Sequence, residues 1–222
     1  MKITSFHLIS IDVHRFPMVS GPRSYDAALV ATGAKCRPLP INGFDLPQVL
    51  LLRTPEDAQR IAGACGPGRR VAVLGSSFIG MELAGTLRRR GCHVTVLGME
   101  QVPFERVLGE RLGAALKAFF EAKDVKFMGG KAALEIRKSG SELQAVLKSG
   151  ETVACDAVVV GVGVIPNAKF VQGAHKAADG SLLTDEYLTL DLEASKNTSM
   201  SSRHVTSHTH VIRLYCHTSV KV

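Results

Sequence analysis

The sequence is poor in aromatic residues and has no long apolar run. Only 5% of the 222 residues are Phe, Trp or Tyr, and no stripe of Lys and Arg alternates with aromatic residues, so nucleic-acid binding is not expected. The most apolar stretch, residues 153–165, contains Asp156 and is too short to span a bilayer, so no membrane span is expected. The net charge of +7 suits the attraction of a small anionic ligand.

Several signatures of disulfide and catalytic chemistry are also missing. The chain has five cysteines, an odd number, and no CxxC pair, which argues against a disulfide framework and a redox-active dithiol and favours a reducing compartment. There is no Walker A sequence and no context for a Ser/His/Asp or Cys/His triad. No catalytic residue is therefore assigned.

The two ends of the chain differ in character from the rest. Residues 1–23 show no clean periodicity and remain unassigned; with Lys2, Arg15 and few acids they weakly match a mitochondrial transit peptide. We expect a cytoplasmic protein, with mitochondrial association as the alternative. Residues 191–222 are rich in Ser, Thr and His, and we expect a disordered or non-native tail without a metal site. Its potential ligands are His204, His208, His210, Cys216 and His217.

Between these ends, apolar runs alternate with helical patterns, which predicts an α/β fold with a parallel sheet. Three strand candidates follow one another at 133–138, 142–148 and 152–161, separated by the short turns SGS and SGE. This pattern indicates a β-meander followed by a buried strand. The expected strands are 25–33, 49–53, 69–75, 92–98, 125–129, 133–138, 142–148 and 152–161.

Three helices are expected, over 54–64, 76–90 and 108–122. The first begins with a Thr54 cap, Pro55 at the first helical position, and Asp57 near the positive end of the dipole. The last places its apolar residues on one helical face. These residues are Leu112, Leu116 and Phe119.

The stretch VAVLGSSFIGMELA, residues 71–84, has the pattern of a phosphate-binding turn. Gly75-x-Ser77-x-x-Gly80 follows a strand and opens a helix, the context in which this pattern indicates dinucleotide binding. Gly75 permits the tight turn, Gly80 allows close packing of helix on strand, and the helix N-terminus attracts phosphate. Ser77 replaces the usual second glycine but is small enough to let the pyrophosphate approach. The alternative is a tight βα turn that binds no ligand.

Other residues are expected around the same crevice. The acid that would accept from the adenosine ribose falls near Gly98; the nearest carboxylate is Glu100, which is either the ribose ligand or a solvated residue. Glu82 is either in the crevice or a surface charge. A second glycine turn, Gly161-Val162-Gly163, either lets a flat ring pass close to the backbone or is an ordinary turn at the end of a strand. The choice between NADH and NADPH stays open.

Taken together, YDAALVATGA, LLRTPEDA, VAVLGSSFIGMELA, VTVLGMEQVPFERVLGE and DAVVVGVGVIPN resemble the pyridine-nucleotide-dependent flavoprotein reductases. The nearest branch is that of the apoptosis-inducing-factor-like proteins, close to rubredoxin and ferredoxin reductases. The five blocks occur in the family's order and spacing over roughly residues 24–190. The resemblance implies hydride transfer from NAD(P)H to FAD, followed by transfer of electrons from FAD to an acceptor such as a ferredoxin-like or Rieske-type protein.

The resemblance also implies roles for particular residues. Ala31, Thr32 and Gly33 form the turn against FAD, and Arg53 is an FAD contact. Glu82 matches the acid near the nicotinamide, and Gly161-Val162-Gly163 the second turn beside it. The residues that match the NAD(P)H phosphate loop are Gly75, Ser77, Phe78, Ile79 and Gly80.

The sequence departs from the family pattern in places. No FAD pyrophosphate fingerprint precedes Tyr25, and Gly98 replaces the acid after the second strand. We therefore expect a truncated chain: a Rossmann-like NAD(P)-binding domain with a β-meander, plus remnants of a second, FAD-binding Rossmann-like domain. The expected segments are 24–66 (partial FAD-binding domain), 67–170 (NAD(P)H-binding domain) and 171–190 (return toward the FAD domain).

Two functions stay open at this point. The chain is either an NAD(P)H-dependent flavoprotein oxidoreductase, whose activity as a truncated chain is uncertain, or a non-catalytic NAD(P)H-binding module. The physiological acceptor and the oligomeric state are not defined by the sequence.

Overall fold

The computed structural model describes residues 30–140, 142–185, 188 and 190, and divides into two compact units. One unit comprises Cys36–Val164, and the other Met1–Lys35 with Ile165–Val222. The predictions for residues 1–23 and 191–222, including the tail histidines, lie outside the described residues.

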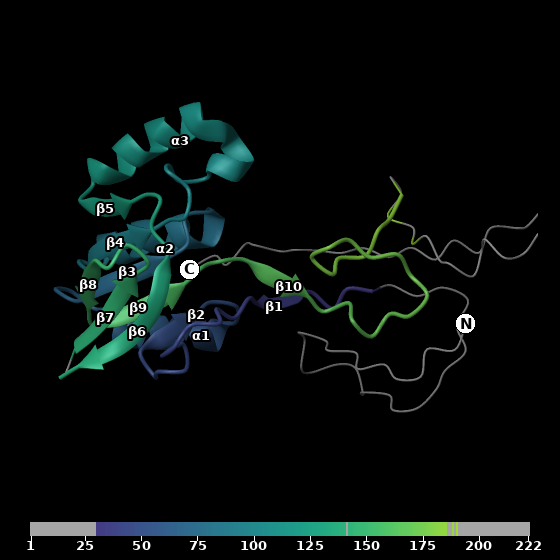
Figure 1. Ribbon diagram of the computed structural model, residues 1–222, viewed down its shortest axis with the longest axis horizontal. Coiled ribbons are helices and arrows are strands. Elements are labelled where there is room, and N and C mark those ends of the chain that lie inside the picture. The colour runs from purple at the N-terminus through teal and green to yellow at the C-terminus, as the bar shows by residue number, and fades with distance from the viewer. Residues whose placement is uncertain (1–29, 141, 186–187, 189, 191–222) are drawn as a thin grey trace, which may run out of the picture. The chain divides into compact units, whose positions relative to one another are not determined.

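A five-stranded parallel sheet forms the centre of the unit Cys36–Val164 (Figure 1). Its strands, in spatial order, are β2 (Val49–Leu51), β9 (Ala157–Val160), β3 (Arg70–Leu74), β4 (His93–Leu97) and β5 (Val125–Met128). The central strands are nearly continuous apolar runs, as expected where both faces of a sheet are covered. The α/β fold expected from the sequence is confirmed.

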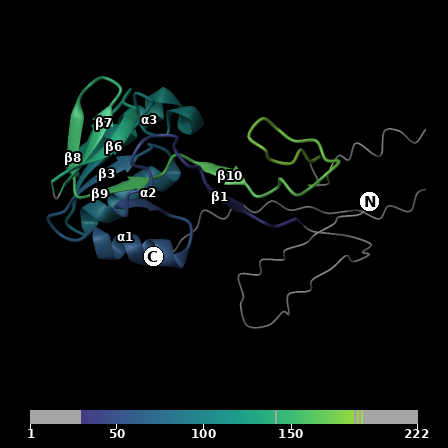
Figure 2. The ribbon, with the colours of Figure 1, turned by 60° about the horizontal axis from the view of Figure 1, so that its bottom comes forward.

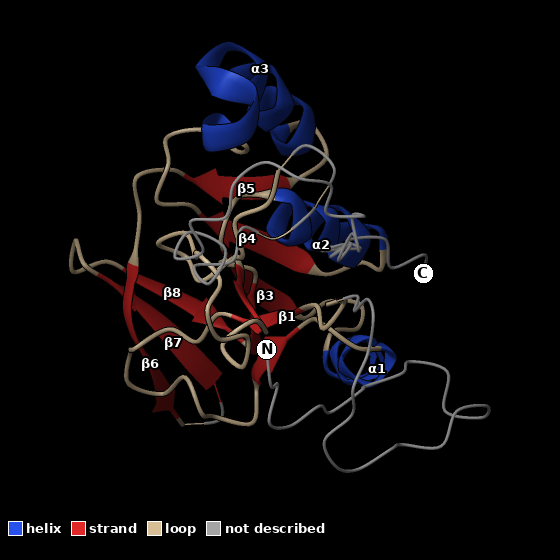
Figure 3. Ribbon diagram, turned by 90° about the vertical axis from the view of Figure 1, so that its right-hand side faces the viewer, coloured by secondary structure: helices blue, strands red, loops and turns tan. Residues whose placement is uncertain are grey.

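Helices and a meander cover the two faces of this sheet. Side chains alternate along each strand, so Val73 packs with the buried residues of α1 (Pro55–Ala64) and α2 (Phe78–Arg89), while Leu74 packs with the meander. Figures 2 and 3 show α1 and α2 on one side of the parallel strands and the meander on the other. These three layers bury the core.

The antiparallel meander consists of β6 (Ala133–Ser139), β7 (Glu142–Leu147) and β8 (Thr152–Cys155). The single strand expected over 152–161 was wrong, because the chain bends at Asp156 and continues as β9 in the other sheet. Asp156 Oδ2 accepts from the Arg70 backbone N at 2.8 Å, and Oδ1 from Arg70 Nη2 at 2.7 Å. These hydrogen bonds from Arg70 lower the pKa of Asp156 and hold the bend.

The third helix, α3 (Glu105–Glu121), departs from its sequence prediction. It begins earlier than residue 108 and is interrupted at Gly109, whose φ is +79°. Leu112 and Phe119 are 48% and 55% exposed, so the expected 112/116/119 face is not the packed one. Gly113 is buried instead, in a place where a Cβ would lie 2.5 Å from a Val102 methyl carbon. Gly113 lies one position after Leu112, so the packed face is offset from the expected face by about one residue, a rotation of roughly 100° about the helix axis.

The second unit is small in its described part. Val30, Ala168, Val171, Leu182 and Leu190 form its buried cluster. β1 (Ala34–Cys36) and β10 (Val164–Pro166) pair where the chain passes from one unit to the other.

The expected strand over 25–33 ends on the turn Ala31–Gly33, and residues 25–29 lie outside the described residues, so the strand stays a prediction. Asn167 holds the turn, because its side-chain amide donates to Thr32 O and its backbone N to Gly33 O.

Residues 36–66, expected in a partial FAD-binding domain, fall within the unit Cys36–Val164, because β2 hydrogen-bonds to β9 along its length. Their part in FAD binding stays a prediction. Within the described residues, no helix combines the length and apolarity needed to cross a membrane.

Candidate functional site

The site lies at the carboxyl edge of the parallel sheet, where the loops after β3 and β9 meet. Gly75 N donates to Leu97 O at 2.9 Å, and Gly161 N donates to Leu74 O at 2.7 Å. A Cβ on Gly75 would lie 2.3 Å from Gly161 O, and the φ of Gly75 is +105°. Both the contact and the backbone angle require glycine at this turn.

The start of α2 is held close to the same turn. A Cβ on Gly80 would lie 2.1 Å from Gly75 O, so only glycine allows this approach of helix to strand. Ser77 is the N-cap residue but makes no side-chain capping hydrogen bond, and the first turn contains no acidic residue. The first backbone N–H groups of α2 thus keep their capacity to donate to an anion.

A cavity of about 340 Å³ opens beside this helix start. It contains many of the residues expected at the NAD(P)H site, brought together from loops far apart in the sequence. The predicted residues that line it are Gly75, Ser77, Glu100, Gly161, Val162 and Gly163.

Four predicted residues of α2 do not line this cavity. Gly80 packs against the backbone of Gly75. Ile79 packs against the hydrophobic core between the sheet and helices α1 and α2. Phe78 is 45% exposed and stacks edge-to-face on Phe104, with ring centroids 5.2 Å apart. Glu82 is exposed on the helix surface, so its assignment near the nicotinamide stays a prediction.

Glu100 lines the cavity and belongs to the loop after β4. Its Oε2 accepts from Ser76 Oγ at 3.1 Å, and its Oε1 is 2.6 Å from Arg106 Nε. Gly98, at the expected position of the acid, has no room for a side chain, since a Cβ there would lie 2.7 Å from Ser76 Oγ.

Several cavity residues were not predicted. Phe104 adopts a left-handed backbone, with φ of 60°, and donates its N–H to Ser76 O. Arg106 and Lys131 bring positive charge to the lining. Ser76 had a detectable signal, since it sits inside the glycine fingerprint. Phe104, Arg106 and Lys131 had no such signal, because they reach the cavity only through the loops that follow β4 and β5 in the folded chain.

The two groups of expected FAD contacts fall in different units. Ala31, Thr32 and Gly33 belong to the unit containing Asn167, where Thr32 Oγ1 donates to Asn167 O at 2.7 Å. Arg53 belongs to the unit Cys36–Val164, where its backbone N donates to Asp57 Oδ2 at 2.9 Å. Within the described residues no carboxylate forms an ion pair with the Arg53 guanidinium, so it is available to an anion.

Cysteine and metal chemistry are not supplied at this cavity by the residues that the structure describes. The described cysteines are free, and none lines the cavity. Burial raises the pKa of Cys65 and of Cys155 to about 11, so both thiols stay protonated at neutral pH. No cluster of three or more metal-ligating side chains occurs in the same ranges.

A parallel sheet with a glycine turn after β3 and an open helix N-terminus beside it defines a Rossmann-like α/β domain. Comparison with known proteins leads to the same class and to a family. The chain belongs to the pyridine nucleotide-disulphide oxidoreductase family, whose model matches residues 14–194.

The curated relatives belong to the branch expected from the sequence. Human apoptosis-inducing factor 3 is 36% identical over 174 residues, which cover 77% of this chain and 29% of the relative. The ferredoxin–NAD(+) reductase component of the biphenyl dioxygenase system of Paraburkholderia xenovorans is 33% identical, with 74% and 40% covered. The chain thus spans less than half the length of these relatives.

A solved structure is similar as well. A ferredoxin reductase from Rhodopseudomonas palustris superimposes with a TM-score of 0.70 at 31% identity, covering 76% of this chain and 42% of that one.

Proposed function

We propose that the cavity at the carboxyl edge of the sheet binds NAD(P)H. The observation that carries this proposal is the uncapped start of α2, which faces the joined turns of Gly75 and Gly161. A pyrophosphate there would accept from the free N–H groups of the first turn and meet the positive end of the helix dipole. Gly161-Val162-Gly163 would then flank the nicotinamide.

We further propose that the chain acts as the NAD(P)H-binding part of a flavoprotein reductase. When bound, FAD supplies the hydride acceptor and passes electrons onward. Family membership supports this proposal. The guanidinium of Arg53, which pairs with no carboxylate among the described residues, fits an anionic FAD group. Ala31, Thr32 and Gly33 would approach FAD through their backbone N–H groups, because the Thr32 hydroxyl and the carbonyls of Thr32 and Gly33 are already bound to Asn167.

The electron acceptor is proposed to be a ferredoxin-like or Rieske-type protein. The support is the relative named as a ferredoxin–NAD(+) reductase component. A reducing compartment, the cytoplasm or a mitochondrial space, fits the free cysteines of the described part. Fractionation of cells, with immunodetection of the chain in each fraction, would test the location.

Titration of the purified full chain with NADH and with NADPH, followed by calorimetry, tests nucleotide binding. We expect one of the two to bind with 1:1 stoichiometry, and ADP-ribose to compete. No binding of either nucleotide would contradict the proposal.

The visible absorption spectrum of the same sample tests the flavin part. A stoichiometric flavin band, together with NAD(P)H-dependent reduction of an artificial acceptor, supports the reductase. Nucleotide binding without flavin or turnover would instead support the second function, a non-catalytic NAD(P)H-binding module.

A further inference from the structure

The phosphate loop and the loop after β4 are tied together by a buried serine. Among residues 30–140, 142–185, 188 and 190, Ser76 is the only polar or charged residue that is buried, at 4% exposure. Its Oγ donates to Glu100 Oε2 at 3.1 Å, and its carbonyl accepts from Phe104 N at 2.9 Å. A buried hydroxyl with a carboxylate partner fixes the direction of that partner.

Ser76 and a side chain at position 98 exclude each other. A Cβ at Gly98 would lie 2.7 Å from Ser76 Oγ, 2.9 Å from Ser76 Cβ and 3.1 Å from Phe127 Cζ. Position 98 directly follows β4, where a Rossmann-type domain places the acid that reads the ribose. In this chain the space is filled by Ser76, and the carboxylate comes from Glu100, two residues later.

The second oxygen of this carboxylate is also held. Arg106 Nε lies 2.6 Å from Glu100 Oε1, and the side chains are 75% and 20% exposed, respectively. A carboxylate has about four lone-pair positions. Two are used here, which leaves Glu100 able to accept from the hydroxyl groups of a ribose in the cavity.

The other charged residues of the cavity lining are already engaged. Lys131 pairs with Glu151, and Glu105 Oε2 accepts from the backbone N–H groups of Gln101 and Val102 at 2.9 and 3.2 Å. Arg106 contacts Glu100 through Nε. Among the described residues of the lining, each cation therefore already has a carboxylate partner, and a 2′-phosphate entering here would meet the Glu100 carboxylate.

We propose that Ser76 positions Glu100 to accept from the adenosine ribose hydroxyls, and that this arrangement makes the chain select NADH over NADPH. The proposal rests on the proposed function, because it requires nucleotide binding in this cavity. Discrimination arises from a hydrogen bond that only the free 2′-hydroxyl donates, together with repulsion between Glu100 and the 2′-phosphate. Ser76 is a positioning residue that acts through Glu100.

The test is the ratio of the NADPH and NADH dissociation constants, measured by calorimetry on the full chain and its variants. We expect the unaltered chain to bind NADH at least about tenfold more tightly, because a hydrogen bond to a charged group contributes at that level. Glu100→Gln retains the shape, removes the charge and releases Arg106. This change should lower the ratio about tenfold or more, mainly through tighter NADPH binding.

Two further variants separate positioning from general charge. Ser76→Ala should weaken NADH binding several-fold, on the order of 3–10-fold, and leave NADPH binding nearly unchanged, whereas a merely structural role would weaken both. Glu105→Gln is the matched control, since it removes the same charge from the same cavity. It should shift the ratio by less than about twofold.

The outcomes distinguish this inference from the proposed function. Equal binding of both nucleotides, with a ratio unaffected by Glu100→Gln, would overturn the inference and leave the cavity as a nucleotide site. Preferential NADPH binding that Arg106→Ala abolishes would also overturn it, with Arg106 as the phosphate ligand. Failure of both nucleotides to bind would overturn the proposed function itself.

Discussion

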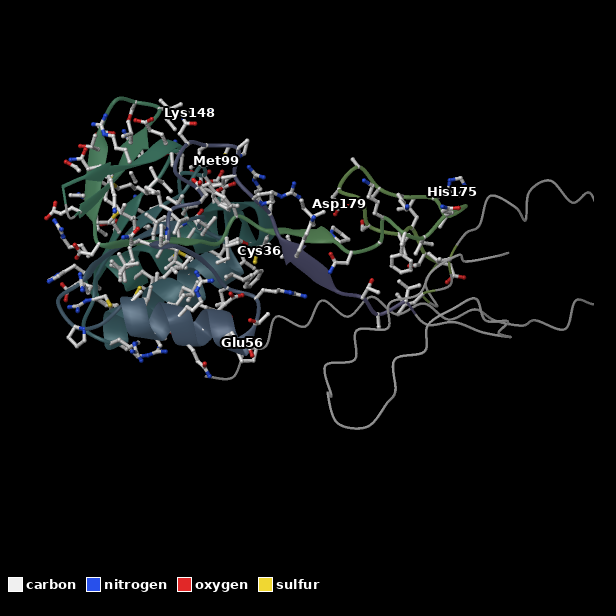
Figure 4. All side chains as sticks on the ribbon, turned by 90° about the horizontal axis from the view of Figure 1, so that it is seen from below. Cys36, Glu56, Met99, Lys148, His175 and Asp179 are labelled. Atoms are coloured by element: carbon white, nitrogen blue, oxygen red, sulfur yellow. The ribbon has the colours of Figure 1, made fainter. Side chains whose placement is uncertain are left out.

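Helices α1 and α2 both follow parallel strands of one sheet, yet their N-termini are opposite in character. At α1, Thr54 Oγ1 accepts from Asp57 N at 3.3 Å, and Asp57 Oδ2 accepts from Thr54 N at 3.1 Å, which closes a capping box. Glu56, at the end of α1 in Figure 4, adds a second acid to the first turn. At α2, Ser77 caps nothing and the first turn has no acid.

This difference separates a structural helix start from one that can bind a ligand. In α1 the free N–H groups are satisfied by the chain's own side chains, so an anion gains little there. In α2 the same groups remain available beside a cavity lined by glycines. The four changes below act on this contrast, in order of decreasing expected effect.

Gly80→Ala should have the largest effect, because the added methyl would lie 2.1 Å from Gly75 O. We expect a loss of about 1–3 kcal/mol in the free energy of unfolding, measured by urea denaturation, and weaker nucleotide binding. Gly85→Ala in the same helix is the control, since its Cβ would meet Phe120 at an ordinary 3.5 Å. That variant should gain about 0.5–1 kcal/mol; a comparable loss in both would show that the close turn is not the cause.

Ser77→Asp would make the start of α2 resemble that of α1. The carboxylate would cap the helix and occupy the place proposed for the pyrophosphate, so we expect nucleotide binding to weaken by at least about tenfold. Stability should be unchanged or higher in thermal unfolding. Ser77→Asn, a cap of similar size without charge, should weaken binding less. Undiminished binding in Ser77→Asp would place the phosphates elsewhere.

Thr54→Ala opens the capping box of α1 and should affect stability alone. The expected loss is about 1 kcal/mol in the free energy of unfolding, since Asp57 N then lacks its acceptor. Nucleotide affinity, measured by calorimetry in parallel, should stay the same. An altered affinity would mean that the two helix starts are coupled.

Glu56→Gln should have the smallest effect, visible only in the pH dependence of stability. A hydrogen bond with Thr54 lowers the pKa of Glu56 below its usual value. A carboxyl with a lowered pKa in the folded state stabilises the fold above the unfolded pKa, about 4.3, and this contribution is lost as the pH falls through the lower folded value. The unfolding midpoint of Glu56→Gln should therefore fall slightly less steeply with decreasing pH, in the acid range, than that of the unaltered chain. Thr54→Ala, which removes the hydrogen-bond partner of Glu56, should weaken the pH dependence of the unfolding midpoint in the same way.

Features that depend on neighbouring residues could be predicted from the sequence. The Thr54 cap, Pro55 at the first helical position and the strand–turn–helix around Gly75 and Gly80 are all present as expected. Each follows from steric or hydrogen-bonding rules that act within a few residues, so the surrounding fold changes them little.

Features that depend on distant neighbours could not be predicted. The bend at Asp156 needs Arg70, which lies 86 residues away. The packed face of α3 is set by the contact of Gly113 with Val102, and not by the spacing of its leucines. Both are decided by which atoms meet after the sheet has assembled.

The sequence alone therefore determined the α/β class, the glycine turn, the closed start of α1 and the family. Only the tertiary structure decided which residue holds the Glu100 carboxylate beside the cavity. Ser76 and Gly98 are 22 positions apart and follow different strands, and nothing local in either requires the other. They become neighbours because β3 and β4 lie side by side in the sheet, and their shared space is what brings Glu100 to the cavity.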